Sequence, residues 1–135
     1  MNILTDANAQ NMQQFTVGVS TSGAPALLTL LDGYLNVNWG QQGGQSYRYL
    51  LGPALAHDKF VRASGTVAFA SVIAQDGATP NSWVQATITN CQADWSDEAQ
   101  QVALQFEITT NRSDPNSLYA GVTLVAYHVA ILAMV

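Results

Sequence analysis

The segment from Asn36 to Arg48 combines amide, aromatic and glycine residues, so it is the first place to look for binding chemistry. Asn and Gln side chains carry both donors and acceptors, and Trp and Tyr faces stack on apolar surfaces such as the C–H faces of sugars. The pattern predicts a site for a glycan or another neutral polar ligand, with the candidate residues Asn36, Asn38, Trp39, Gln42, Tyr47 and Arg48. The alternative is that Trp39 and Tyr47 anchor two strands in the core, while the Gln and Gly residues form a hairpin tip.

A second candidate region surrounds Trp95, which adds another aromatic ring to the possible ligand-binding residues. Asp94, Asp97 and Glu98 lie close to it and could offer hard oxygen ligands to calcium. Their spacing fits no EF-hand, and no glycine stands at the sharp-turn position. We therefore expect a solvated acidic loop rather than a strong metal site, and no cofactor.

Residues suited to catalysis are few. His57 and Asp58 are adjacent, and neighbours along a strand point to opposite faces. Two His and one Cys barely reach the ligand number that zinc needs, and no P-loop, dinucleotide-binding or nucleophile-elbow pattern is present. Cys91 is interpreted as a small buried hydrophobe at a strand end. The remaining enzyme hypothesis is a small β-barrel acting on an apolar substrate, with His128 or Tyr127 inside a cavity.

Composition limits the possible partners. The chain has 135 residues and a net charge of −5, and only 10% of its residues are charged, far below the usual quarter. Its four basic residues, Lys59, Arg48, Arg62 and Arg112, form no cluster, which argues against binding to nucleic acid or to an anionic membrane. One cysteine allows no internal disulfide.

The N-terminus has neither the basic region nor the apolar core of a signal peptide. We therefore expect either a cytoplasmic protein or export without a cleaved signal, for example within an assembled particle.

The stretch from Gly121 to Val135 is almost wholly apolar. Both strand faces of the stretch are apolar, and Thr, Val, Tyr and Ile are typical strand residues. It is shorter than the roughly 20 residues of a membrane span. We expect a strand that is buried on both faces, as in a sandwich core or a subunit interface.

Alternating apolar and polar residues predict the other strands. Thr5 and Asp6 could cap a short helix over 7–14, although residues 1–14 could equally form an extended arm. The turn chemistry of 21–23 and the Asp32-Gly33 pair predict two turns. The expected elements are strands over 15–20, 46–51, 60–75, 83–89 and 102–109, a hairpin over 26–39, an acidic loop over 90–99 and the final strand. Gly65 is expected to mark a bulge or bend.

Eight or nine strands without a long helix predict an all-β, single-domain antiparallel β-sandwich over residues 1–135, jelly-roll or Greek-key. A small β-barrel is the alternative. Three function classes fit this sequence: a lectin-like carbohydrate-binding oligomer, a structural or assembly protein of a particle or fibre, and the small barrel enzyme. Because a two-layer sandwich buries one face of each sheet, the final strand also predicts a homo-oligomer.

Overall fold

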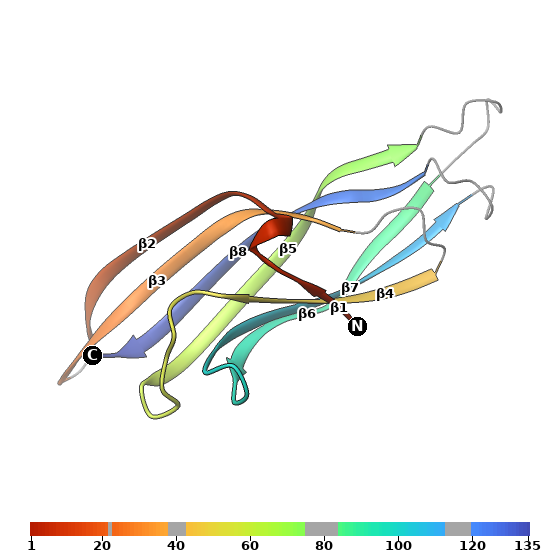
Figure 1. Ribbon diagram of the computed structural model, residues 1–135. Coiled ribbons are helices and arrows are strands. Elements are labelled where there is room, and N and C mark those ends of the chain that lie inside the picture. The colour runs from red at the N-terminus through yellow and green to blue at the C-terminus, as the bar shows by residue number, and fades with distance from the viewer. Residues whose placement is uncertain (22, 38–42, 75–83, 113–119) are drawn as a thin grey trace.

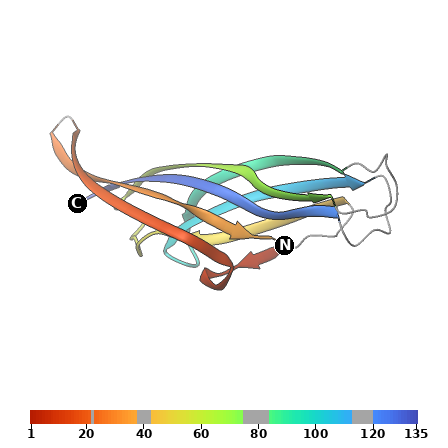
Figure 2. The same ribbon diagram turned by 90° about the horizontal axis from the view of Figure 1, so that it is seen from above.

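The computed structural model describes residues 1–21, 23–37, 43–74, 84–112 and 120–135. In these residues eight strands form two four-stranded sheets, which confirms the predicted all-β sandwich. Figures 1 and 2 show an elongated body whose strands run along its length. The β7 sheet has the order β1 (Asn2–Leu4), β4 (Gly43–Leu51), β7 (Gln101–Arg112) and β6 (Val84–Ser96). The β8 sheet has the order β2 (Ala9–Thr21), β3 (Ala24–Asn36), β8 (Ala120–Met134) and β5 (Phe60–Ala74).

In both sheets, a strand from the C-terminal part of the chain lies between two strands that precede it in sequence. β8 lies between β3 and β5, and β7 lies between β4 and β6. All of these pairs are antiparallel, but β1 pairs with β4 in parallel, which corrects the expectation of a purely antiparallel fold. The reason is the path of the chain: β1 leads into β2 of the other sheet, so no hairpin joins β1 to β4.

The N-terminal segment is mostly extended rather than helical. A 3₁₀ helix, η1, covers only Asp6–Asn8. Thr5 precedes it as predicted, and its N–H donates to Asn8 Oδ1 at 3.0 Å. The Asn/Gln-rich residues that follow offer no apolar stripe to a helix, whereas β3 offers a partner, and β2 begins at Ala9.

The hairpin expected around Asp32-Gly33 is wrong, because β3 runs straight through both residues. The chain reverses instead before Ala24, which pairs with Thr21, and Gly23 has a φ of 93°. Gly33 serves packing: a Cβ there would lie 2.9 Å from the Tyr127 hydroxyl oxygen. The glycine thus makes room for a ring from β8 rather than forming a turn.

The loop expected over 90–99 is also wrong, because β6 continues to Ser96. A bulge interrupts the register between Thr89 and Gln92, and Asn90 adopts a φ of 52° there. The bulge adds unpaired residues to β6, and pairing with β7 resumes beyond it. The turn between β6 and β7 is confined to residues 97–100.

The core lies between the two sheets. The predicted inward face of β7 is confirmed, because Val102, Leu104, Phe106 and Ile108 are all buried. Tyr47 of β4 is 1% exposed and stacks on Phe106, with ring centroids 5.2 Å apart. β8 contributes Val125, Tyr127, Val129 and Ile131 from the other layer.

The two sheets approach closely where β5 faces β6. Gly65 does not mark a bulge, because the register shifts in β5 lie near Phe60 and Ser71. A Cβ on Gly65 would lie 3.0 Å from the Cβ of Ala93. Cys91 lies within β6 rather than at its end, and its thiol contacts the Gly65 carbonyl at 3.6 Å. Burial raises the pKa of this thiol, which disfavours the nucleophilic thiolate.

Candidate functional site

The residues predicted to bind a glycan are not brought together by the described structure. Asn38, Trp39 and Gln42 lie outside the described residues. Asn36 donates its side-chain N–H to the Asn8 carbonyl at 3.2 Å. Tyr47 faces the core, as the alternative interpretation had it, so its ring is not presented to a ligand.

The side chains of Arg48 and Trp95 form hydrogen bonds with residues that are distant in sequence. Arg48 points to the opposite side of β4 from Tyr47, and its guanidinium donates to Ser96 Oγ at 2.7 Å. The Trp95 indole N–H donates to the Leu55 carbonyl at 2.8 Å, and its ring stacks on His57 at 4.5 Å. Both groups therefore have structural partners, and the glycan site stays a prediction.

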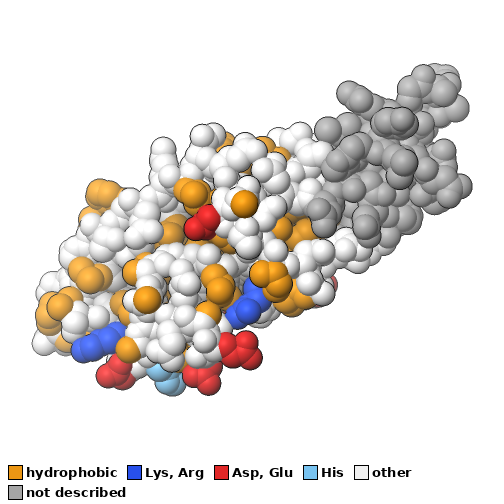
Figure 3. Space-filling model, viewed as in Figure 1, with side chains coloured by type: hydrophobic (Ala, Val, Ile, Leu, Met, Phe, Trp, Pro, Cys, Tyr) orange, Lys and Arg blue, Asp and Glu red, His pale blue; other side chains and the backbone are white. Residues whose placement is uncertain are grey.

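The acidic residues near Trp95 are divided between a strand and a turn. Asp94 lies in β6 and accepts the Trp95 backbone N–H at 2.8 Å, while Asp97 and Glu98 lie in the 97–100 turn. Within the described ranges, no group of three His, Cys, Asp or Glu residues could hold a metal ion. Figure 3 shows charged side chains gathered along the lower edge of the view, over the connections from β4 to β5 and from β6 to β7.

The final strand is buried on one face only, which corrects the expectation of two buried faces. Its inward residues, including Val125, Tyr127 and Ile131, pack in the core. The opposite face carries Leu124, Ala126, Ala130, Leu132 and Met134, all partly exposed, and His128, which is exposed. The cause is the two-layer architecture, in which nothing in the described part of the chain covers this side.

The uncovered surface extends across neighbouring strands. Phe15 of β2 pairs with Leu30 of β3, which pairs with Ala130 of β8; Phe15 is 62% exposed and Leu30 is 44% exposed. Further along, the same face carries Val17, Val19, Leu28, Leu132 and Met134. We call this surface, formed by the outward residues of β2, β3 and β8 with β5 beside them, the outer face.

One polar row crosses the outer face. Asp32 of β3 lies directly opposite His128 of β8, and His128 lies opposite Thr66 of β5. These residues line a shallow hollow of about 300 Å³ together with Leu30, Ser64 and Ala130. His128 is therefore on an exposed surface rather than inside a cavity, which was one of the two placements that the enzyme hypothesis named.

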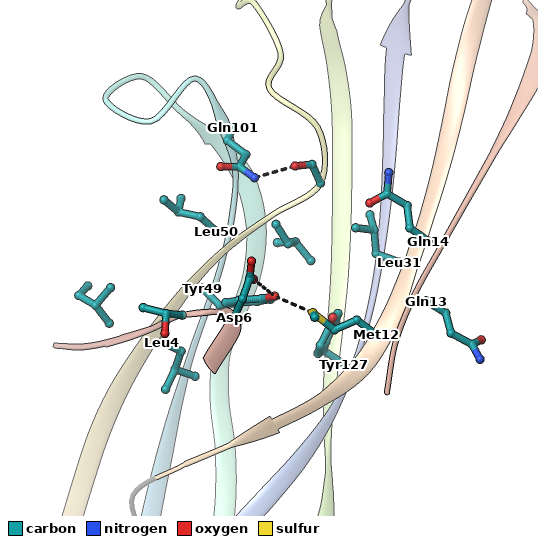
Figure 4. Close-up of a pocket in the computed structure, with 14 residues that line it drawn as sticks. Leu4, Asp6, Met12, Gln13, Gln14, Leu31, Tyr49, Leu50, Gln101 and Tyr127 are labelled. Atoms are coloured by element: carbon teal, nitrogen blue, oxygen red, sulfur yellow. Dashed lines mark hydrogen bonds between the residues drawn. The ribbon is translucent and has the colours of Figure 1, made fainter. Parts of the chain in front are cut away.

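A separate crevice opens between the sheets on the side of β1 and β2. Its volume is about 490 Å³, and it is formed by β1, η1, β2, β4 and single residues of β3, β7 and β8. Leucines 4, 31, 50 and 51 form apolar walls. Figure 4 shows Asp6, Met12, Tyr49 and Tyr127 gathered at one place in it. No local sequence pattern indicates this crevice, because its residues come from both ends and the middle of the chain.

The polar centre of the crevice is a tyrosine pair next to a carboxylate. The Tyr49 hydroxyl donates to Asp6 Oδ1 at 2.8 Å and lies 3.4 Å from the Met12 sulfur. The Tyr49 and Tyr127 rings are 5.8 Å apart. Burial is the main cause that raises the pKa of both tyrosines, and for Tyr49 the bond to Asp6 raises the pKa further. Both phenols thus stay neutral hydrogen-bonding groups at physiological pH.

We expect alkaline pH to destabilise the protein through its buried tyrosines. Burial raises the pKa of Tyr47, Tyr49 and Tyr127 above the unfolded-state value, which is about 10. Their contribution to the free energy of unfolding is therefore complete below about pH 10 and is lost as the pH rises toward the folded-state pKa. Tyrosinate absorbance and circular dichroism, measured together in an alkaline titration, would test this. Complete tyrosine ionisation at about pH 10 with an unchanged dichroism spectrum would contradict it.

No protein-family model matches the chain, and no curated protein or solved structure matches it. None of the helical segments in the described ranges is long and apolar enough to cross a membrane.

Proposed function

We propose that this protein is a structural subunit that assembles with copies of itself through the outer face of the β8 sheet. The observation that carries the proposal is the uncovered apolar surface that runs across β2, β3 and β8. The largest apolar patch on a soluble monomer is typically about 300–600 Å², and larger ones mark interaction sites. A sheet face of this kind is normally covered by a second layer.

The size of the outer face suits a stable interface. β3 has 13 residues, and with about 3.3 Å per residue and about 4.8 Å between strands, four such strands cover roughly 800 Å². Standard protein interfaces bury about 800 Å² on each partner. The outer face of one subunit is therefore about as large as the surface that one partner buries in a standard interface.

The polar pair on the outer face favours a second copy as the partner. Asp32 and His128 lie directly opposite each other on β3 and β8, so every copy carries a carboxyl group and an imidazole side by side. A two-fold axis parallel to the strands, midway between β3 and β8, would place Asp32 of each copy over the partner's His128. Such self-complementarity is the property of an isologous interface.

The test compares the same substitution on the two outer surfaces of the sandwich. Leu30→Lys places a charge in the middle of the outer face, where burial against a partner would be costly. Thr87→Lys places the same charge on an exposed position of β6, on the far side of the molecule. Light scattering coupled to size-exclusion chromatography should give a multiple of 14.4 kDa for the wild type and Thr87→Lys, and 14.4 kDa for Leu30→Lys.

Circular dichroism should show the same strand content for all three proteins, because Leu30 points away from the core. A wild-type mass of 14.4 kDa at low micromolar concentration would refute the proposal. An oligomer that Leu30→Lys leaves intact would show that assembly uses another surface.

A further inference from the structure

We infer that the crevice between the two sheets binds a small organic ammonium ion with an apolar body. This site is distinct from the outer face, because the crevice opens at the edge of the sandwich on the side of β1 and β2. The inference does not depend on self-assembly.

The charge of the crevice comes from one carboxylate. Asp6 is the only charged side chain among the described residues that line it, and it is exposed to solvent at the opening. Its Oδ1 accepts the Tyr49 hydroxyl, and no ion pair with a basic side chain is formed in the described part of the chain. The hydrogen bond from Tyr49 therefore fixes the position of the carboxylate, and its exposure lets it bind an external cation.

The groups beside Asp6 are suited to an ammonium head. The buried Tyr49 phenol fixes the carboxylate through its hydrogen bond, and the Met12 side chain, which is 51% exposed, lies beside it as a soft, polarisable and adaptable group. A hard metal ion needs more oxygen ligands with formal charge than this site offers. An anion would meet the negative charge of Asp6 on a chain whose net charge is −5.

The rest of the crevice is suited to an apolar body. Leu4, Leu31, Leu50 and Leu51 form apolar walls beside the polar side chains of Thr5, Gln13, Gln14 and Gln101. The volume of about 490 Å³ lies in the range of about 300–1,000 Å³ usual for small-molecule sites. Met12, on the rim strand β2, is a side chain that adapts easily to different ligand shapes. The expected ligand class is therefore an amine with a short alkyl or aromatic substituent.

The experiment titrates the full chain with three probes that share one alkyl chain: hexylammonium, 1-hexanol and hexanoate. Calorimetry at neutral pH should show hexylammonium binding about tenfold more tightly than hexanol, as expected for a charge-assisted hydrogen bond at a partly exposed site. Hexanoate should bind more weakly than either. Equal binding of hexylammonium and hexanol, or no binding of hexylammonium at millimolar concentration, would overturn the inference.

Two variants assign the effect to Asp6. Asp6→Asn keeps an acceptor for Tyr49 but removes the charge, and it should bring hexylammonium to the affinity of hexanol. Asp58→Asn, an exposed aspartate in the connection before β5, is the matched control and should bind like the wild type. If Asp6→Asn binds hexylammonium as tightly as the wild type does, the site is not the crevice and the inference is wrong.

Methionine methyl resonances locate the ligand independently of affinity. Met12 lines the crevice, whereas Met134 lies on the outer face. Hexylammonium should shift the Met12 methyl signal and leave the Met134 signal in place. A shift of Met134 alone would overturn the inference by placing the ligand on the outer face, and self-assembly would still be judged separately from the molecular mass.

Discussion

Replacing Phe106 with alanine is expected to lower the free energy of unfolding by about 3–5 kcal/mol. Phe106 is 1% exposed, lies near the middle of β7 and stacks on Tyr47. Its removal leaves a cavity between two sheets whose backbones are held by hydrogen bonds on both sides, so little collapse can fill it. Urea denaturation followed by circular dichroism would measure the change.

Gln105 is the matched control for Phe106 because it is the preceding residue of the same strand and points to the other side. Its amide is partly exposed, and the hydrogen bond that it accepts from Gln92 is long, at 3.4 Å. Gln105→Ala should change the free energy of unfolding by less than about 0.5 kcal/mol. Equal losses from the two substitutions would mean that the register of β7 is wrong.

The second large effect is expected from Gly65→Ala, which should destabilise the fold by about 1–3 kcal/mol. The new Cβ would lie 3.0 Å from both the Ala93 Cβ and the Leu104 Cδ1. The Ala93 Cβ cannot rotate away because it is attached directly to the backbone, so β5 and β6 would have to separate.

Two further variants test this explanation. Gly18→Ala adds the same methyl group to a strand position with nothing within 4 Å, and it should be neutral or stabilise by up to about 1 kcal/mol. In an Ala93→Gly background the cost of Gly65→Ala should fall, because its closest rigid neighbour is gone. Strict additivity of the two changes would indicate that the Ala93 contact is not the cause.

Strand alternation predicted the fold class because half-buried strands carry that pattern locally. β7 is the clearest case: Val102, Leu104, Phe106 and Ile108 face the core as their spacing indicates. The predicted end of the strand over 46–51 also coincides with the end of β4 at Leu51, and the following Gly52 has a φ of 80°. The local sequence was therefore sufficient to predict the buried face of β7 and the end of β4.

The wrong predictions arise where distant residues decide the local structure. Asp32-Gly33 has hairpin chemistry, but Gly33 is required by the ring of Tyr127, which comes from the other end of the chain. The alternation of apolar and polar residues in β6 ends near Thr89. Pairing with β7 nevertheless continues beyond the bulge between Thr89 and Gln92, so β6 extends to Ser96. The crevice could not be predicted at all, since Asp6 and Tyr49 are 43 residues apart in sequence and meet only because β1 pairs with β4.

The position of β8 between β3 and β5 has a consequence for the kinetics of folding. Leu35 pairs with Val125, and Val67 pairs with Tyr127, so the centre of the β8 sheet closes only through contacts between segments far apart in sequence. Folds dominated by such contacts form in about milliseconds to seconds rather than microseconds. During synthesis, β3 and β5 both leave the ribosome before their shared neighbour does. Their unpaired edges are then open to other nascent chains, which makes the period before β8 emerges the time of greatest aggregation risk.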